Sequence, residues 1–211
     1  MVWVLTRLIL ASAVYGFSIG SVHSWTYACR NLIKFPLLIL VTAAVCALAY
    51  NVLARFLTPE LSFRDVQRLV MALFQDAAVM LASLSPISFF LARTIVQPVP
   101  DDLGEYPFFQ GVNVFFIAAC GSIAVIRQAR ALIGAHHLLR RTGLALVTGW
   151  LALSLFTGAQ CAWYMRPFFG ISYMGRGSPP FFSGTRPDFR GARSFYEAVY
   201  NLVSPPDGSG R

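Results

Sequence analysis

The chain has 211 residues, of which 56% are hydrophobic and 12% are charged, and its mean hydropathy is +0.61. Soluble domains usually carry about 25% charged residues, so these values exclude an ordinary water-soluble protein. The formal net charge of +8 suits an anionic membrane surface. A basic chain can also bind nucleic acid, but no module that combines basic and aromatic residues is present, so no nucleic-acid partner is expected.

Five apolar runs follow one another along the chain, and each is close to the roughly 20 residues that cross a bilayer core as a helix. They cover residues 4–21, 35–56, 66–91, 108–126 and 144–164. The sequence therefore predicts an all-α fold, an integral membrane bundle of five transmembrane helices within residues 1–166. Residues 167–211 are predicted to form an extracytoplasmic tail that is rich in Gly, Pro, Phe and Arg.

The first run contains the sequence GFSIG at 16–20, which matches the G-x-S-x-G pattern of serine hydrolases. In those enzymes the serine lies on a turn between a strand and a helix, whereas Ser18 lies inside a transmembrane run. His23 is five residues away, which is beyond hydrogen-bond reach on one helix. We therefore favour a packing role, in which Gly16 and Gly20 let another helix approach closely.

The third run carries a polar pair, Gln75 and Asp76, in the middle of its apolar residues. A carboxylate inside a membrane is costly unless it is paired, protonated or hydrated, and it marks a functional residue by default. Gln75 and Asp76 are therefore candidates for an ion or proton pathway. The alternative is a structural interaction with one of four groups: Ser83, Asn113, Gln160 or Arg7.

Basic residues are distributed unevenly over the connections between the runs. Cytoplasmic loops of membrane proteins carry an excess of Lys and Arg. Here the arginines concentrate around the second and fourth connections: Arg55, Arg64, Arg68, Arg127, Arg130, Arg140 and Arg141. We therefore expect the N-terminus in the cytoplasm and the C-terminus outside. The arginines expected to meet anionic lipid headgroups are Arg127, Arg130, Arg140 and Arg141.

The turn after the last run holds candidate partner-binding residues. Arg166 can bind phosphate or carboxylate through two N–H groups, and Pro167 fixes the direction of the chain. Phe168 and Phe169 offer apolar anchors of the kind found in interface cores. The alternative interpretation is a helix terminator with aromatic residues at the membrane interface.

Further along the tail, the sequence predicts a short amphipathic helix at 195–203. Ser194 and Glu197 form a capping box at its start. Phe195 and Val199 share one helical face, which suits a helix lying at the membrane interface. We count both residues among the candidates for partner binding.

The cysteines and histidines do not indicate a metal or cofactor, and no catalytic residue is predicted. The four cysteines are Cys29, Cys46, Cys120 and Cys161, without C-x-x-C spacing. The adjacent histidines His136 and His137 would point in different directions on a helix, so they do not suit a shared metal. Cys29 and Cys161 fall near the predicted outer boundary, where the sequence is compatible with a disulfide or with two free thiols.

Residues 160–170, at the end of the last run, follow the pattern QxAWxxRPFxG, and KFPLLIL at 34–40 opens the second run. These two stretches resemble a family of uncharacterised five-span bacterial inner-membrane proteins. In outline the five-span layout is also similar to Yip1-type membrane proteins. The resemblance implies a bacterial inner-membrane location and no known reaction.

Three functional hypotheses follow from these patterns. The first is a non-catalytic membrane subunit or scaffold, whose partners are other membrane protein subunits bound through its helices, outer loop and tail. The second is a small transporter or a proton- or ion-conducting subunit that uses Asp76. The third, an intramembrane enzyme, has the least support because no acid, base and nucleophile converge.

Overall fold

The structure is a computed structural model that describes residues 2–22, 24–59, 61–95, 106–168, 181–182, 194–197 and 200. These residues form helices and no strand. The long helices are α1 (Val2–Gly20), α2 (Trp25–Leu57), α3 (Phe63–Thr94), α4 (Tyr106–Ala135) and α5 (Arg140–Tyr164). Each is long and apolar enough to cross a membrane. The chain is therefore an all-α, multi-pass membrane protein, and this sequence prediction is confirmed.

Several helices are longer than the apolar runs that predict them. α2 has 33 residues and α3 has 32, so each is about 50 Å long, against roughly 30 Å for a bilayer core. Both are extended at their N-terminal ends by a capping serine. The Ser24 hydroxyl accepts from the Tyr27 N–H at 3.2 Å, and the Ser62 hydroxyl accepts from the Asp65 N–H at 3.3 Å. Apolar runs mark the lipid-spanning part of a helix, whereas caps mark its ends.

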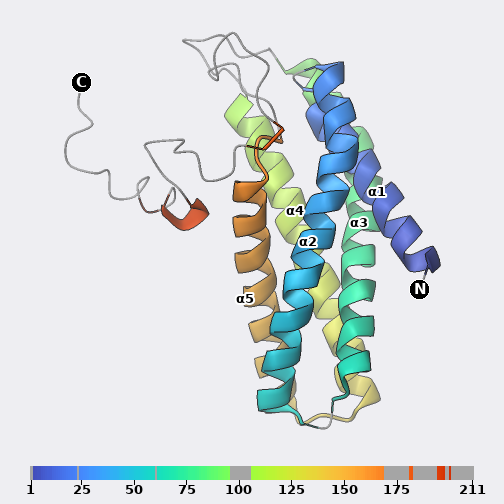
Figure 1. The fold of residues 1–211 in the computed structure, drawn as a ribbon, viewed down its shortest axis with the longest axis vertical. Coiled ribbons are helices and arrows are strands. Elements are labelled where there is room, and N and C mark those ends of the chain that lie inside the picture. The colour runs from blue at the N-terminus through green and yellow to red at the C-terminus, as the bar shows by residue number, and fades with distance from the viewer. Residues whose placement is uncertain are drawn as a thin grey trace.

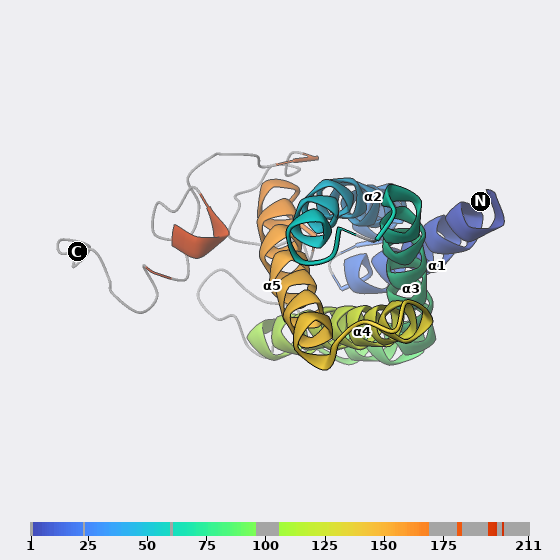
Figure 2. The same ribbon diagram turned by 90° about the horizontal axis from the view of Figure 1, so that it is seen from below.

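The helices are arranged as a ring of four with a fifth inserted (Figures 1 and 2). Seen along the bundle, α2, α3, α4 and α5 surround the axis in chain order. α1 packs against both α2 and α3. Its C-terminal half lies inside the bundle, and its N-terminal half diverges from it. α1 therefore wedges α2 and α3 apart at one end of the molecule.

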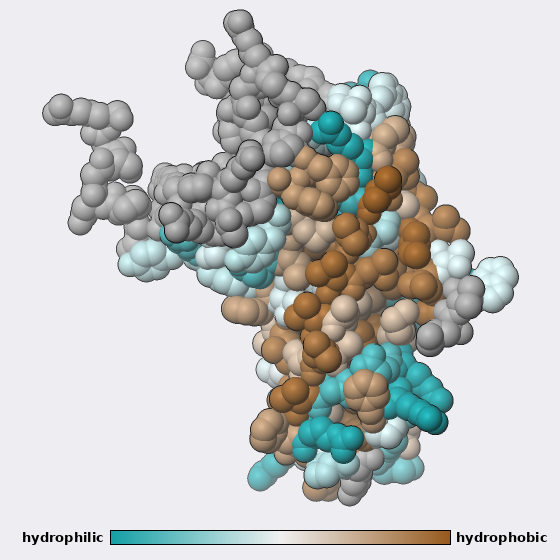
Figure 3. Space-filling model, in the orientation of Figure 1, coloured by the Kyte–Doolittle hydropathy of each residue, from teal (hydrophilic) through white to brown (hydrophobic). Residues whose placement is uncertain are grey.

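The two ends of the bundle differ. The basic end, which we define by the α2–α3 and α4–α5 connections, carries seven exposed arginines: Arg55, Arg64, Arg68, Arg127, Arg130, Arg140 and Arg141. The tail end is the opposite one, with the α1–α2 connection. Figure 3 shows hydrophilic residues at the basic end and an apolar belt above it. Such a belt is what a helix bundle presents to lipid.

α5 is shifted toward the basic end (Figure 1). The Tyr50 ring of α2 stacks on the Trp150 ring of α5, with centroids 5.1 Å apart. Pro167, just after α5, already contacts Lys34, which is about two and a half turns into α2. At the tail end, therefore, α1 and the turn after α5 occupy the bundle where α5 is missing.

Buried polar side chains connect the helices. The Tyr15 hydroxyl of α1 and the Ser88 hydroxyl of α3 each donate to Asn113 Oδ1 of α4, both at 2.8 Å. Asn113 Nδ2 donates to the Phe109 carbonyl at 2.9 Å. All three side chains are fully buried. Because every member has a partner, this network fixes how the three helices pack.

Candidate functional site

The best-defined site is a lysine clamp where α5 ends beside α2. Lys34 is only 2% exposed, and its Nζ donates to the Pro167 carbonyl at 2.7 Å. One turn away, Asn31 Nδ2 donates to the Phe168 carbonyl at 2.5 Å. Two consecutive carbonyls of the turn after α5 are thus held by two donors of α2.

Aromatic rings surround the lysine of this clamp. The Lys34 Nζ lies 5.3 Å from the ring centroid of Phe168, and 5.2 Å from those of Phe181 and Phe182. The ion pairs within the described residues all involve Asp65, at the basic end. The Lys34 amino group is therefore bonded to a carbonyl and lies among aromatic rings, whose faces attract cations. We call these residues the lysine clamp: Asn31, Lys34, Pro167, Phe168, Phe181 and Phe182.

The predicted partner-binding residues at 166–169 differ in their surroundings. Pro167 and Phe168 are buried, and the Phe168 ring lies edge-on to Phe35 with centroids 6.2 Å apart. The structure gives Phe168 a packing role inside the chain, not that of an exposed anchor. Arg166 is half-buried, and its guanidinium lies 3.7 Å from the Trp163 ring centroid. Phe169 lies outside the described residues.

The described part of the tail beyond the clamp rests against α5. The Tyr196 ring stacks on Phe156 with centroids 4.4 Å apart, and Phe195 lies edge-on to Trp163 at 6.4 Å. Residues 195–197 are helical, and the Glu197 N–H donates to the Ser194 hydroxyl at 3.2 Å. Val199 of the predicted helix lies outside the described residues. Phe195 thus reaches α5 of its own chain.

Asp76 has a partner that the sequence did not suggest. Gln128 Nε2 of α4 donates to Asp76 Oδ2 at 2.7 Å. Ser83 instead donates to the Met80 carbonyl of its own helix, and Asn113 accepts from Tyr15 and Ser88. The sequence does not indicate Gln128 as a partner because the fourth apolar run ends at residue 126, whereas α4 continues to Ala135.

This hydrogen bond also shows where Asp76 lies along the axis of the bundle. Gln128 is flanked by the exposed Arg127 and Arg130. Asp76 and the half-buried Gln75 therefore lie level with arginines, where a charged side chain can reach headgroups. This position suits a structural bond between α3 and α4 as well as it suits a pathway.

Gly16 and Gly20 lie where α1 crosses α2. A Cβ on Gly16 would lie 2.5 Å from the Asn31 carbonyl oxygen, and one on Gly20 would lie 2.9 Å from the Ala28 Cα. Contacts under 3.0 Å essentially do not occur, so only glycine fits. Ser18 is 4% exposed and donates to the Val14 carbonyl at 3.1 Å. These contacts give the GFSIG stretch a packing role. His23 lies outside the described residues.

Other buried polar atoms have no hydrogen-bond partner within the part of the chain that the structure describes. They are Asn31 Oδ1, Thr42 Oγ1, Gln160 Oε1 and Trp163 Nε1, all on α2 or α5. A buried polar atom normally bonds to protein or ordered water. Each of these four atoms on α2 and α5 has the capacity for a further hydrogen bond.

The cysteines and the residue types that bind metals lie apart from the lysine clamp. Cys29 is exposed and Cys161 is half-buried, and both are free thiols. In the described ranges, no three His, Cys, Asp or Glu side chains come together as metal ligands would. The sequence-predicted lipid-facing arginines, Arg127, Arg130, Arg140 and Arg141, are exposed at the basic end.

Comparison with known proteins gives no relative: no protein-family model, no curated protein and no solved structure matches this chain.

Proposed function

We propose that the chain is a non-catalytic integral membrane subunit or scaffold of a larger membrane protein complex. It would dock partners through its helices, its outer loop and its tail, in a bacterial inner membrane. The resemblance of residues 160–170 to five-span inner-membrane proteins supports the location. The observation that carries the proposal is the uncovered side formed by α4 and α5.

α5 is the least covered of the spanning helices. In the most apolar 18-residue stretch of α5, only 11% of the residues are buried. The corresponding share is 28% for α4 and 39 to 44% for the other three helices. Its exposed residues include Ala145, Thr148 and Ala152, which recur at helical spacing on one face. Small residues are enriched where membrane helices approach each other. This side of the bundle therefore has the composition of a helix–helix contact.

Two glycines on α4 also suggest a contact with a helix of another chain. A Cβ on Gly111 or Gly121 would meet no atom of the described chain within 4 Å, in contrast to Gly16 and Gly20. A glycine inside a helix is roughly 1 kcal/mol less favourable than alanine. In α1 that cost is offset by the close approach of α2. In α4 a helix from another chain would supply the same compensation.

The positive charge of the basic end supports the orientation we propose, with the N-terminus in the cytoplasm and the C-terminus outside. The seven exposed arginines of that end flank two short connections. Arginines near the ends of spans and in short loops resist translocation. Lipids with anionic headgroups would be partners of the same arginines.

The test uses Gly121→Leu. Because no described atom lies within 4 Å of the new Cβ and leucine favours a helix more than glycine does, the variant should melt at or above the temperature of the natural protein. It should lose any stoichiometric companion that the natural protein retains in mild detergent. Val79→Leu, at an exposed position of α3, is the matched control and should retain it. A natural protein that purifies as a lone monomer would contradict the proposal.

A second candidate function is a small transporter or a proton- or ion-conducting subunit using Asp76. The unpartnered buried atoms of Thr42 and Gln160 favour it, because polar atoms without partners suit a hydrated path. Asp76→Asn keeps an acceptor for Gln128 and removes the charge. Lost flux in proteoliposomes with an intact complex would favour transport, whereas a lost complex without a flux effect would favour the scaffold.

A further inference from the structure

One face of the N-terminal half of α1 is turned away from the rest of the bundle. Its exposed residues follow one another at intervals of four, three and four: Trp3, Arg7, Leu10 and Val14. This spacing is typical of residues that line the contact between two packed helices. Leu8, on the opposite side of α1, is fully buried. Because this half of α1 diverges from α2 and α3 (Figures 1 and 2), the outer face is open to another helix.

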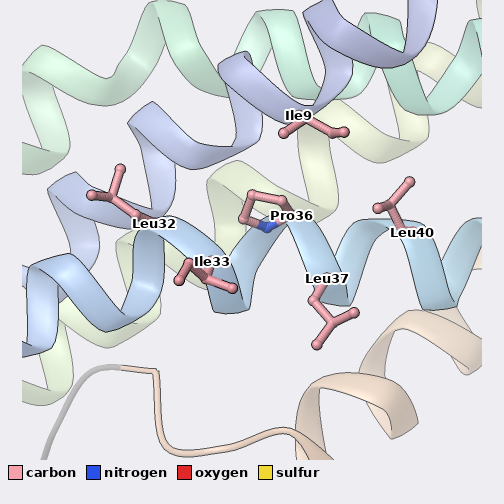
Figure 4. A pocket seen from close by; sticks show the side chains of 6 residues that line it. All are labelled: Ile9, Leu32, Ile33, Pro36, Leu37 and Leu40. Atoms are coloured by element: carbon pink, nitrogen blue, oxygen red, sulfur yellow. The ribbon is translucent and has the colours of Figure 1, made fainter.

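Arg7 of this face lies level with the apolar part of α2. The two helices run in opposite directions, and Gly16 of α1 lies against Asn31 of α2. Further toward the N-terminus of α1, Ile9 lines one groove together with α2 residues up to Leu40 (Figure 4). Arg7 is two residues beyond Ile9 in the same direction. Its backbone is therefore level with Leu40, inside the apolar run at 35–56.

The guanidinium of Arg7 lies still further from the tail end. Side chains of a helix tilt toward its N-terminus, and the Arg7 Cζ lies 5.7 Å from the ring centroid of Trp3, one turn in that direction. Along α2, Leu40 is about 9 Å from Lys34 and about 22 Å from Arg55, the residues that mark the two ends of the apolar run. The cation is therefore held within the hydrocarbon layer, away from the headgroups at both surfaces.

A cation at this depth requires a compensating charge. Charged side chains inside a bilayer are costly, and they normally pair with each other or with backbone carbonyls. The Trp3 ring attracts the cation, but it offers no oxygen to the N–H groups of the guanidinium. The ion pairs within the described residues all involve Asp65 at the basic end. Asp76, the other acid of α3, accepts from Gln128 of α4.

We infer that the outer face of α1 binds a transmembrane helix of a partner protein, and that a carboxylate of this helix pairs with Arg7. A carboxylate can accept two parallel N–H bonds from a guanidinium. Acyl chains would cover Leu10 and Val14 equally well, but they provide no acceptor for Arg7. A second copy of this chain does not provide one either, because Asp76 is the one acid in its described apolar runs and faces Gln128.

This contact is separate from the one on α4 and α5. The N-terminal half of α1 projects on the opposite side of the bundle from α5 (Figure 2). The inference rests on the proposed role of the chain as a membrane subunit, and it adds the chemistry of a second partner helix. A partner on each side would place the chain between two other subunits.

Binding of model transmembrane peptides to the full chain in phosphatidylcholine vesicles tests the inference. The probe is a Leu–Ala helix of about 20 residues with lysines at both ends and one central Asp. A peptide with a central Leu is its control. Energy transfer from a donor on Cys29 to an acceptor on the peptide measures the affinity, in a Cys161→Ala background. We expect the Asp peptide to bind about tenfold more tightly, as one strong polar contact between membrane helices allows.

Variants show whether Arg7 causes this preference. Arg7→Leu should bind both peptides equally, whereas Arg7→Lys should keep part of the preference because it keeps the charge. Arg140→Leu, at an exposed position of the basic end, should keep all of it. Melting temperatures show that each variant is folded, and the comparison of the two peptides on the natural protein needs no variant.

Two results would overturn the inference. One is equal binding of the Asp and Leu peptides to the natural protein, and the other is an Asp preference that survives in folded Arg7→Leu. Neither result concerns the contact on α4 and α5, whose test is the companion lost in Gly121→Leu. The failure of this inference and the failure of the proposed function can therefore be told apart.

Discussion

Single side chains at the tail end decide whether α1 can enter the bundle. Gly16 and Gly20 let α1 approach α2 until backbone atoms touch, with a hypothetical Cβ only 2.5 to 2.9 Å from α2. Asn31 and Lys34, which lie one helical turn apart on α2, hold the turn after α5. A few residues of α2 thus bind two segments that are far apart in sequence.

Gly16→Val should destabilise the protein strongly. The added Cβ meets the Asn31 carbonyl, which belongs to the backbone and cannot move without shifting α2. Overpacking of this kind usually costs about 1–3 kcal/mol, and more where backbone must move. Thermal unfolding in detergent measures the effect. Gly111→Ala, where the Cβ meets open space, should be neutral or slightly stabilising. Equal melting temperatures for the two variants would contradict the packing argument.

Lys34→Met should release the turn after α5 from α2. The Pro167 carbonyl loses its donor, and hydrogen bonds from charged groups contribute about 1.5–3 kcal/mol each. We expect a lower melting temperature together with faster tryptic cleavage of the tail. Arg140→Met removes an exposed cation at the basic end and should change neither value. Unaltered cleavage in Lys34→Met would show that the clamp does not hold the tail.

At the scale of helices, the lengths of the bundle elements matter as much as their number. α1 has 19 residues and α5 has 25, against 30 to 33 for the helices between them. Neither end helix runs the full height of α2. α1 occupies the tail end, α5 is shifted to the basic end, and α2, α3 and α4 contribute to both halves. The protein therefore contains two four-helix packings that share three helices.

Substitutions in the hydrogen-bond network of Asn113 test how firmly α1 is held in the tail-end half of the bundle. Tyr15→Phe removes one bond to Asn113 and should cost about 0.6 kcal/mol, the average for side-chain bonds between membrane helices. Asn113→Leu leaves two buried hydroxyls without their acceptor, which costs about 1–3 kcal/mol each. In the double variant Tyr15 no longer has a hydroxyl to orphan, so the combined effect should be smaller than the sum. Additive losses of stability on thermal unfolding would mean that the bonds do not act together.

The sequence predicts the helices well and their contacts poorly, for a physical reason. Hydropathy reports the length of apolar surface, so the five runs appear in the structure as five helices. The contacts depend on rotation and stagger, which the runs do not encode. Asn113 and Gln160 are suggested as partners of Asp76 because they lie within runs, yet its partner is Gln128, beyond the fourth run. Lys34 lies just before the second run, which starts at residue 35, yet it lies well inside α2, because the Ser24 cap extends this helix past its apolar core.

At the scale of the whole molecule, the feature most relevant to function is that the helices are buried to different extents. α1 lies against α2 and α3, whereas α4 and α5 have the smallest buried shares. The same side receives the described tail residues Phe195 and Tyr196. Partner docking on this side would therefore involve two helices and part of the tail together.

Orientation is the last property of the whole molecule, and native cysteines allow a direct measurement. Cys29 is exposed near the tail end, and Cys46 and Cys120 are buried. If the seven arginines keep the basic end in the cytoplasm, a membrane-impermeant maleimide should label Cys29 in intact cells. A Cys161→Ala background removes the half-buried thiol.

The reciprocal variant completes this test. Cys29→Ala combined with Leu139→Cys places a thiol at the basic end, on a position that is 79% exposed. We expect labelling only after the membrane is permeabilised, because charge asymmetry fixes the side on which the α4–α5 connection stays. Labelling of Leu139→Cys in intact cells would invert the topology.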